Sequence, residues 1–362
     1  MIRILASLFL LASSAFAATE IGSMNGAAFR IDKPDNHNGR LIVYCHGYSG
    51  APGAFRESPL NPILAQFHDS GYAVIQSGYS TGGWAVEQAL RETEALREYF
   101  INKHGKPSRT VVMGHSMGGL LTVALVERFP SAYDAGLPLC GALSPSLPFA
   151  SAREFDALIL FNHYFPAILG PASKPAPPSG FGGPLGKAIT AAITAAPEKA
   201  EALRQWLGLK KTAEIPGLIS FMASIQAELV QRTGGNPFDN RDTVYSGGPD
   251  DQSVNRGVER HAADPKSMDY MRTFVTTTGR IERPLLAVHT TYDPIVPASS
   301  PNAYRDLVQL NGKSGLFVQR WVARDGHCTM NAPEIGAAFA DLVKWLDSGV
   351  RPAHGEQLPA PR

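Results

Sequence analysis

A single serine lies between two glycines in the stretch VVMGHSMGGLL, residues 111–121. Gly114 and Gly118 stand two residues before and two residues after Ser116. Glycine at both positions removes side chains that would clash in a sharp strand-to-helix turn, and such a turn exposes the serine hydroxyl. A helix that begins after Ser116 also brings free backbone N–H groups close to a bound carbonyl oxygen. Two hypotheses follow: a tight turn with no chemical role, or a turn that presents Ser116 as a nucleophile.

A serine hydroxyl is a poor nucleophile at neutral pH, so it needs a base to accept its proton and a carboxylate to orient that base. Asp293 follows the predicted strand 285–290, and His327 follows the predicted strand 316–322. Both would lie at the carboxyl ends of strands, where open α/β sheets gather functional groups. The rival acid is Asp325, which lies two residues before His327 on one tight loop and would therefore point elsewhere.

The elements that must position these residues are short strands and amphipathic helices. Short, nearly continuous apolar runs are typical of strands buried on both faces. Such runs cover residues 40–45, 71–76, 109–113, 135–140, 283–289 and 316–322. Helical patterns lie between and after them, at residues 85–103, 117–129 and 333–346. The alternation predicts an α/β fold with a mostly parallel sheet and helices on both faces, and Asn25-Gly26 predicts a hairpin turn that opens the sheet.

A long insertion separates the predicted strands 135–140 and 283–289, and a structureless connection of that length would be unusual. Residues 169–186 are rich in Pro and Gly, whereas 197–209 and 216–232 predict helices with proline near the first turn. We therefore expect a mostly helical cap inserted into the sheet domain. The expected organisation is a core in two parts, the cap between them and a loose tail: residues 18–144 and 281–350, 145–280, and 351–362.

The N-terminal residues 1–17 predict a secretory signal peptide. Arg3 supplies positive charge, residues 4–16 form an apolar run, and Ala15-Phe16-Ala17 has the pattern of a cleavage site. The apolar run is short for a bilayer span, which needs about 20 residues. We therefore expect an exported protein, secreted or periplasmic, cleaved near Ala17-Ala18 and without a membrane span in the mature chain.

Charge and cysteine content restrict the partners further. The chain has 33 basic and 32 acidic side chains, so no strong field for nucleic acid or anionic lipid is expected. Its three cysteines, Cys45, Cys140 and Cys328, allow one disulfide in an oxidising compartment. We expect Cys140 to pair with Cys328, because both would lie near strand ends beside the site; three buried thiols are the alternative. Paired CxxC units and a His/Cys cluster are absent, so neither a metal nor a cofactor is expected.

In combination, these motifs resemble the α/β-hydrolase superfamily. His46-Gly47 after a strand, the G-x-S-x-G turn, a strand followed by Asp293-Pro294, and the late Gly326-His327 occur in the superfamily's order, as do serine, acid and histidine. The resemblance covers nearly all of the expected mature chain except the cap. It implies that Ser116 is the nucleophile, that His327 is the general base and then the acid, and that Asp293 orients it.

The resemblance also implies where an oxyanion would bind. The backbone N–H of Met117 is the first expected donor, because Met117 follows the nucleophile. The second donor is expected in the loop that reads CHGYSG, which resembles the superfamily's His-Gly oxyanion turn. Tyr48 N–H is our prediction and Gly47 is the alternative, since the longer HGGG form is absent. His46 is expected to shape this turn by hydrogen bonding, and His115 and His289 are expected to be packing residues.

The three predicted catalytic residues do not specify the substrate class, because esters, thioesters and amides share the acyl-enzyme route. Export favours processing of external material, so we expect a carboxylic ester hydrolase of esterase, lipase or feruloyl/tannin-esterase type. One alternative is a prolyl oligopeptidase-like serine peptidase, with Glu259, Asp264 and Asp269 as candidates for binding a substrate amine. The other is a non-catalytic binding member of the fold.

Aromatic residues are the candidates for the substrate pocket. Trp84 and Tyr164 are our pocket candidates, with simple packing as the alternative for both. The aromatic residues of the cap suit a hydrophobic acyl or aryl group, but the cap also needs them to fold: Phe155, Phe161, Tyr164, Phe165, Phe181 and Trp206.

Overall fold

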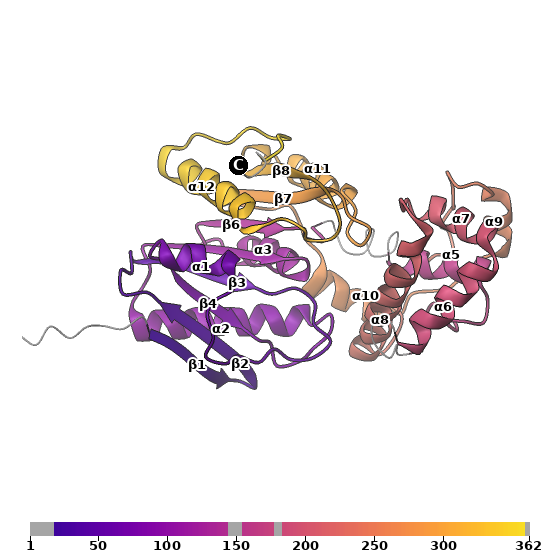
Figure 1. Cartoon of the computed structure of the whole chain (residues 1–362), viewed down its shortest axis with the longest axis horizontal. Helices are drawn as coiled ribbons and strands as arrows, with labels where there is room; N and C mark the ends of the chain where they lie inside the picture. The colour runs from indigo at the N-terminus through magenta and orange to yellow at the C-terminus, as the bar shows by residue number, and fades with distance from the viewer. Residues whose placement is uncertain (1–17, 144–153, 177–182, 359–362) are drawn as a thin grey trace, which may run out of the picture.

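The computed structural model describes residues 18–143, 154–176 and 183–358, so the predicted signal peptide and Phe181 lie outside the described residues. An eight-stranded sheet with the order β1-β2-β4-β3-β5-β6-β7-β8 forms the centre (Figure 1). The strands are β1 (Ala18–Met24), β2 (Ala27–Lys33), β3 (Arg40–Cys45), β4 (Ala73–Ser77), β5 (Arg109–His115), β6 (Ala135–Leu139), β7 (Leu285–Tyr292) and β8 (Phe317–Asp325). β2 runs antiparallel to β1 and β4, whereas the pairings from β4 onward are parallel.

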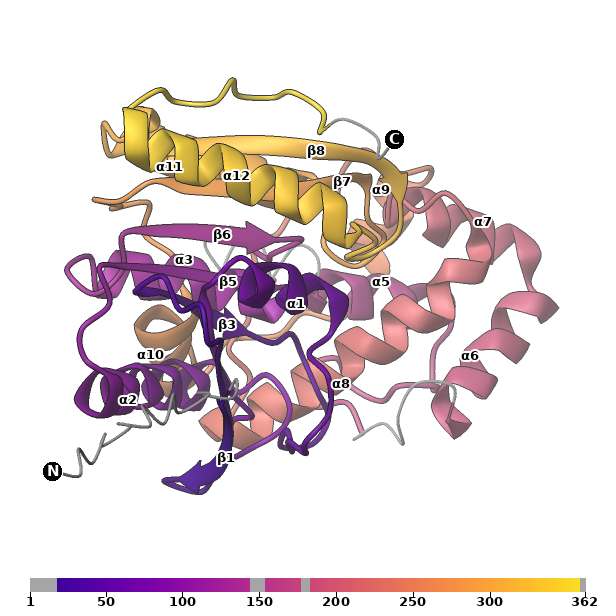
Figure 2. The same cartoon turned by 60° about the vertical axis from the view of Figure 1, so that its left-hand side comes forward.

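Helices cover both faces of the sheet, as the sequence predicts (Figures 1 and 2). One face carries α2 (Val86–His104), α3 (Met117–Arg128) and α11 (Ser299–Leu310), whose apolar side chains share one buried cluster. The other face carries α1 (Pro62–Asp69) and α12 (Ala332–Ser348), which pack in a second cluster. Helices α1 and α11 were not predicted from the sequence. The fold class is nevertheless confirmed: this strand order between two helical layers is the α/β-hydrolase fold.

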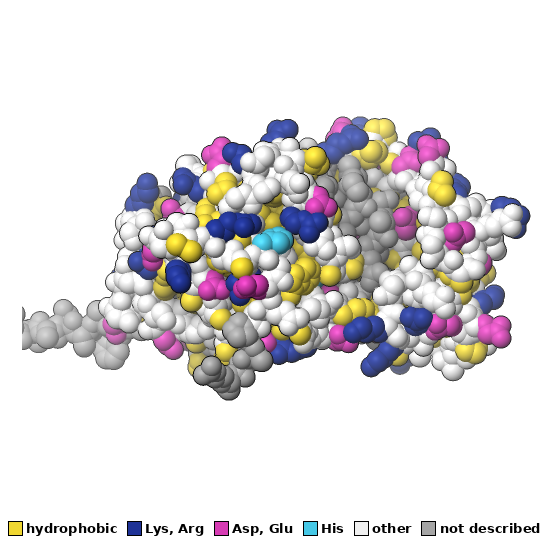
Figure 3. All heavy atoms as spheres, turned by 90° about the horizontal axis from the view of Figure 1, so that it is seen from above, with side chains coloured by type: hydrophobic (Ala, Val, Ile, Leu, Met, Phe, Trp, Pro, Cys, Tyr) yellow, Lys and Arg dark blue, Asp and Glu magenta, His cyan; other side chains and the backbone are white. Residues whose placement is uncertain are grey.

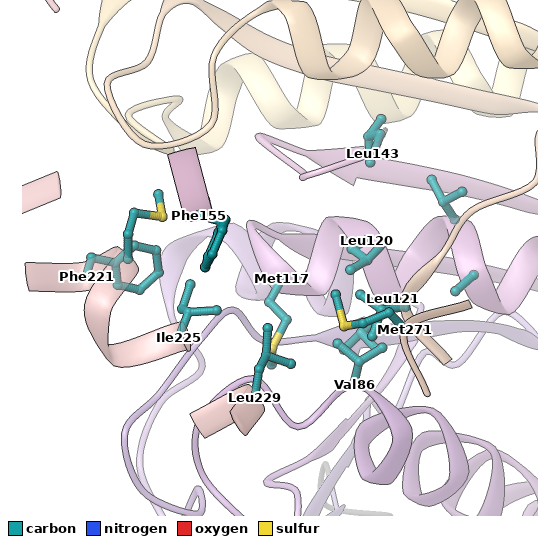
Figure 4. Close-up of a cluster of buried hydrophobic side chains, with 14 of the residues drawn as sticks. Val86, Met117, Leu120, Leu121, Leu143, Phe155, Phe221, Ile225, Leu229 and Met271 are labelled. Carbon is teal, nitrogen blue, oxygen red and sulfur yellow. The ribbon is translucent and has the colours of Figure 1, made fainter. Parts of the chain in front are cut away.

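Between β6 and β7 the chain forms helices, most of which lie beyond the end of the sheet, whereas the last of them, at residues 265–270, lies near α2 (Figures 1 and 2). They are α5 (Asp156–Tyr164), α6 (Pro184–Ala195), α7 (Pro197–Trp206), α8 (Ile215–Thr233), α9 (Asp251–Gly257) and α10 (Pro265–Tyr270). Their buried apolar side chains continue the cluster of the α2 and α3 face, and Phe155, Ile225 and Leu229 lie around Met117 (Figure 4). Because sheet and helices share one apolar core, we propose that this insertion is a cap and not an independent domain.

The C-terminal segment differs from the expected loose tail. The backbone N–H groups of Gly355 and Leu358 donate to the carbonyl oxygens of Gln319 and Trp321 in β8, at 2.8 and 2.7 Å. Leu358 is buried in the apolar cluster beneath α12. β8 is an edge strand, so one side of it presents backbone N–H and C=O groups that pair with no neighbouring strand. The C-terminal segment, which the structure describes up to residue 358, forms hydrogen bonds with some of these groups.

On the face drawn in Figure 3, Lys and Arg side chains are interspersed with Asp and Glu side chains. Among the residues that the structure describes, no helix is both long enough and apolar enough to cross a membrane.

Candidate active site

Ser116 lies at a sharp reversal between β5, which ends at His115, and α3, which begins at Met117. Its φ of 57° and ψ of −118° place it in a sparsely populated region of backbone conformation, at a cost of order 1–3 kcal/mol. A Cβ at Gly114 or Gly118 would lie 2.4 or 2.0 Å from the carbonyl oxygen of Cys45. The two glycines therefore allow the end of β3 to pack against this turn, which explains why they flank the serine.

Three side chains from distant parts of the chain converge at this turn. His327 Nε2 lies 2.8 Å from Ser116 Oγ, and His327 Nδ1 lies 2.6 Å from Asp293 Oδ2. The other carboxylate oxygen of Asp293 accepts hydrogen bonds from the backbone N–H groups of Ile295 and Val296, at 2.9 and 3.0 Å. The structure thus brings together the three residues that the sequence analysis selects, in hydrogen-bonding order.

The Asp293 carboxyl is buried, and its surroundings favour the charged form. Burial raises the pKa of Asp293, but the hydrogen bond and the charge of His327, with the Val296 N–H, lower it more, so the net pKa is lowered. An ionised carboxylate at this position holds the Nδ1–H of His327. Nε2 is then free to accept the Ser116 proton, which is the arrangement required for general-base activation of a serine.

Asp325, the rival acid, faces another partner. Its exposed carboxylate lies 2.7 Å from the Nζ atom of Lys210, which is in the segment between α7 and α8. The loop that carries His327 is fixed separately, because Gly326 N–H donates to the Tyr292 carbonyl and Thr290 Oγ1 donates to the Gly326 carbonyl, both at 2.9 Å. Asp325 therefore links the core to the cap segment.

The other histidines near the site have local partners. His46 Nδ1 donates to the Gly47 carbonyl at 2.7 Å, and its ring stacks on Tyr79.

His115 Nδ1 lies 3.1 Å from the Tyr44 hydroxyl, and burial together with repulsion from His327 lowers the pKa of His115 to about 4. His289 Nε2 lies 2.7 Å from the Val296 carbonyl, and burial lowers the pKa of His289. These contacts agree with turn-shaping for His46 and with packing for His115 and His289.

The loop after β3 lies directly against the serine. A Cβ at Gly47 would lie 3.3 Å from Ser116 Cβ and 3.1 Å from the His115 carbonyl oxygen. Met117 is the first residue of α3, where a backbone N–H has no acceptor within its own helix. Both segments that should supply oxyanion donors are therefore adjacent to Ser116.

Sequence reasoning missed Glu228, a residue of α8 that contacts this region. The Tyr48 hydroxyl donates to Glu228 Oε1 at 2.6 Å, and the backbone N–H of Trp84 donates to Glu228 Oε2 at 2.9 Å. Glu228 is 180 residues from Tyr48 in the chain and 144 from Trp84. No local motif marks such a residue, because only the docking of α8 on the core brings it to these loops.

The pocket candidates differ in their surroundings. Trp84 is partly buried against the apolar core beside Gly83. The Tyr164 hydroxyl donates to Asp250 and accepts a hydrogen bond from Trp206 Nε1 at 3.0 Å, so its contacts are those of the packing alternative. Three further aromatic residues of the cap are buried in the apolar cluster that the cap shares with the sheet domain: Phe155, Phe161 and Phe165.

The three acidic residues considered for binding a substrate amine have other partners. Glu259 lies 3.1 Å from His261 Nε2, and Asp269 lies 3.1 Å from Arg272. Asp264 caps α10 by accepting hydrogen bonds from two backbone N–H groups. Within the described ranges, no group of His, Cys, Asp or Glu side chains is arranged to hold a metal ion.

The predicted disulfide is confirmed. Cys140 and Cys328 are bonded across 188 residues, and Cys45 is a buried free thiol. The bond joins the chain directly after β6 to the residue that follows His327, and Cys328 Sγ lies 3.4 Å from His327 Nε2. It therefore fixes the histidine loop to the centre of the sheet.

Removing this disulfide should destabilise the protein. We expect the Cys140→Ser/Cys328→Ser variant to lose about 2–4 kcal/mol of unfolding free energy, because a cross-link over a long loop restricts the unfolded chain. Urea unfolding monitored by tryptophan fluorescence measures the loss. Dithiothreitol should lower the stability of the wild type to that of the variant and leave the variant unchanged. A variant as stable as the oxidised wild type would contradict this expectation.

Comparison with known proteins finds similarity to hydrolases. No family model matches the sequence. An o-phthalyl amidase of Xanthobacter agilis is 25% identical over 412 aligned positions, covering 92% of this chain and 88% of that protein.

Solved structures that match the chain include Est1E, an acylaminoacyl peptidase and a puromycin hydrolase. Est1E from Butyrivibrio proteoclasticus is 14% identical, with a TM-score of 0.48 over 91% of this chain and 99% of that chain. The acylaminoacyl peptidase of Pyrococcus horikoshii is 11% identical, with a TM-score of 0.46 over 85% of this chain and 37% of that chain. The puromycin hydrolase is 14% identical, with a TM-score of 0.46 over 95% of this chain and 40% of that chain. The chain thus spans less than half the length of the peptidase and of the puromycin hydrolase.

Proposed function

We propose that this chain is a serine hydrolase that cleaves carboxylic esters through an acyl-enzyme intermediate. The observation that carries the proposal is the position of the His327 ring, which lies within hydrogen-bond distance of Ser116 Oγ on one side and of Asp293 Oδ2 on the other. A packing role for the serine turn would not require a base and a buried carboxylate in line with it. The same arrangement argues against a non-catalytic binding role.

The proposed reaction has two stages. In the first, His327 Nε2 accepts the Ser116 proton while Oγ attacks the substrate carbonyl carbon, and the tetrahedral oxyanion is stabilised by the backbone N–H groups of Met117 and Tyr48. His327 then donates that proton to the leaving oxygen, and the alcohol departs. In the second stage, His327 accepts a proton from water while the water oxygen attacks the acyl carbon. The bond between that carbon and Ser116 Oγ then breaks, His327 returns the proton to Oγ, and the carboxylic acid departs. Asp293 stabilises the imidazolium ion in both stages.

Amide cleavage is the second candidate, because the curated relative is an o-phthalyl amidase. The same residues would act, with His327 protonating a leaving nitrogen in place of a leaving oxygen. The peptidase alternative has less support, since its three candidate acidic residues have other partners.

We also propose that the protein is exported. The predicted signal peptide supports this proposal, and so does the disulfide, since disulfides persist mainly in oxidising compartments.

A matched pair of substrates distinguishes ester from amide specificity. The purified protein is assayed with p-nitrophenyl butyrate and with the p-nitroanilide of the same acid, and the Ser116→Ala variant serves as control. We expect kcat/KM for the ester to exceed that for the anilide. An anilide cleaved as efficiently as the ester would favour the amidase candidate, and preferential cleavage of a prolyl p-nitroanilide would favour the peptidase.

A further inference from the structure

Glu228 joins the cap to two loops of the core. Its carboxylate accepts hydrogen bonds from the Tyr48 hydroxyl and from the backbone N–H of Trp84, one on each oxygen. Gly83 leaves room for this carboxylate, because a Cβ at that position would lie 2.6 Å from Glu228 Oε2. Gly83 also has a φ of +84°, which disfavours any other residue. The core loop is thus shaped to receive an acidic side chain from α8.

Other residues on the same side of α8 contact the two segments beside Ser116. Phe221 packs edge-on against the Tyr48 ring, with ring centroids 5.1 Å apart. One and two turns later, Ile225 and Leu229 lie near the Met117 side chain (Figure 4). Phe221, Ile225 and Glu228 are spaced by four and three residues, which places them along one face of the helix. This face therefore packs against both residues whose backbone N–H groups are the proposed oxyanion donors.

The Tyr48 hydroxyl is a suitable permanent donor to this carboxylate. Burial, reinforced by the hydrogen bond and charge of Glu228, raises the pKa of Tyr48 above its ordinary value, so the phenol keeps its proton. A hydrogen bond to an ionised acceptor is about twice as strong as one between neutral groups. The side chain of Tyr48 is consequently held at its far end, while its neighbour Gly47 lies against Ser116.

We propose that Glu228 is a positioning residue, which holds the Tyr48 loop so that its backbone N–H faces the developing oxyanion. This inference rests on the proposed function. Through Glu228, the position of the cap sets the geometry of the oxyanion site. Catalytic rate, and not only substrate affinity, then depends on the hydrogen bond between Glu228 of α8 and Tyr48 of the core.

Arg232 of α8 makes a second contact between the cap and the core, and this contact is expected to contribute to stability only. Arg232 donates to Gln88 Oε1 at 2.9 Å and to the Gly82 carbonyl at 3.3 Å. These bonds also attach the cap to the core, but they do not involve Tyr48. Arg232→Ala should therefore lower thermal stability and leave kcat close to the wild-type value.

The test compares Glu228→Gln and Tyr48→Phe with Arg232→Ala, and uses Glu198→Gln on the exposed surface of α7 as the matched control. Loss of an oxyanion donor costs about 10²–10³-fold in kcat, and a displaced donor should cost less. We expect both variants to lower kcat about 10- to 100-fold on p-nitrophenyl butyrate, with KM changed less than about twofold. Phenylboronic acid, which forms a tetrahedral serine adduct, should bind more weakly by a similar factor.

The double variant separates a shared hydrogen bond from two independent effects. The kcat of Tyr48→Phe/Glu228→Gln should lie within about twofold of the kcat of the slower single variant, because both changes remove the same interaction. An unchanged kcat accompanied by a lower melting temperature, as in Arg232→Ala, would overturn the positioning role. Multiplied effects in the double variant would also overturn it. Activity that survives Ser116→Ala would instead refute the proposed function.

Discussion

Replacing Ser116 by alanine is expected to lower kcat about 10⁶-fold, the loss seen when the nucleophile of a serine triad is removed. The variant keeps the backbone of the turn and leaves the hydrogen bond between His327 and Asp293 in place, but no atom remains to form the acyl-enzyme. Initial rates on p-nitrophenyl butyrate measure the loss. The matched control is Ser348→Ala at the exposed end of α12, which should retain full activity.

The size of this loss separates nucleophilic catalysis from weaker effects. The oxyanion donors and substrate binding would remain in Ser116→Ala, and they sustain only a small residual rate above the uncatalysed reaction. A variant that folds, as judged by its circular dichroism and melting temperature, and keeps more than about 1% of kcat would show that Ser116 is not the nucleophile.

The second large effect is expected at Asp293. Asp293→Asn should lower kcat about 10⁴-fold, because an amide in place of the carboxylate favours the wrong tautomer of His327 and no longer stabilises the imidazolium ion. Asp325→Asn is the matched control, since Asp325 lies two residues from His327 but faces Lys210. Its kcat should stay within about threefold of the wild type, because an exposed ion pair contributes little. Steady-state rates of both variants on the same ester provide the comparison.

These two variants also assign the acid without relying on the fold. A large loss of kcat in Asp325→Asn with a small loss in Asp293→Asn would show that Asp325, and not Asp293, is the acid that orients His327. Similar losses in both would indicate a general disturbance of the histidine loop, which the disulfide to Cys140 would be expected to resist.

Local patterns were sufficient to predict the sheet and the three converging side chains. The predicted strand at residues 40–45 coincides with β3, because a strand buried on both faces needs an unbroken apolar run. Asp293 and His327 follow β7 and β8, and parallel strands end at one edge of a sheet. Their approach to Ser116 therefore follows from strand order, and the spatial proximity of Cys140 and Cys328 follows in the same way.

The features that were missed depend on contacts between distant segments. Glu228 is one of many charged residues on cap helices, and only the docking of α8 brings it to Tyr48. The pairing of the C-terminal segment with β8 depends on an edge whose backbone groups are unpaired, and no side-chain pattern reveals that edge. α1 is different: Asn61 caps it by accepting from Leu64 N–H, and Pro62 follows, so its sequence did contain a recognisable helix start.

Activation of Ser116 as a nucleophile by its hydrogen bond to His327 underlies both the proposed function and the role of Glu228. The most direct measurement is incubation with a fluorophosphonate, followed by intact-mass analysis and peptide mapping. We predict one adduct per chain, located on Ser116, and none in Ser116→Ala; labelling should be much slower in His327→Ala. An adduct on another residue, or equal labelling of wild type and Ser116→Ala, would show that Ser116 is not the activated nucleophile.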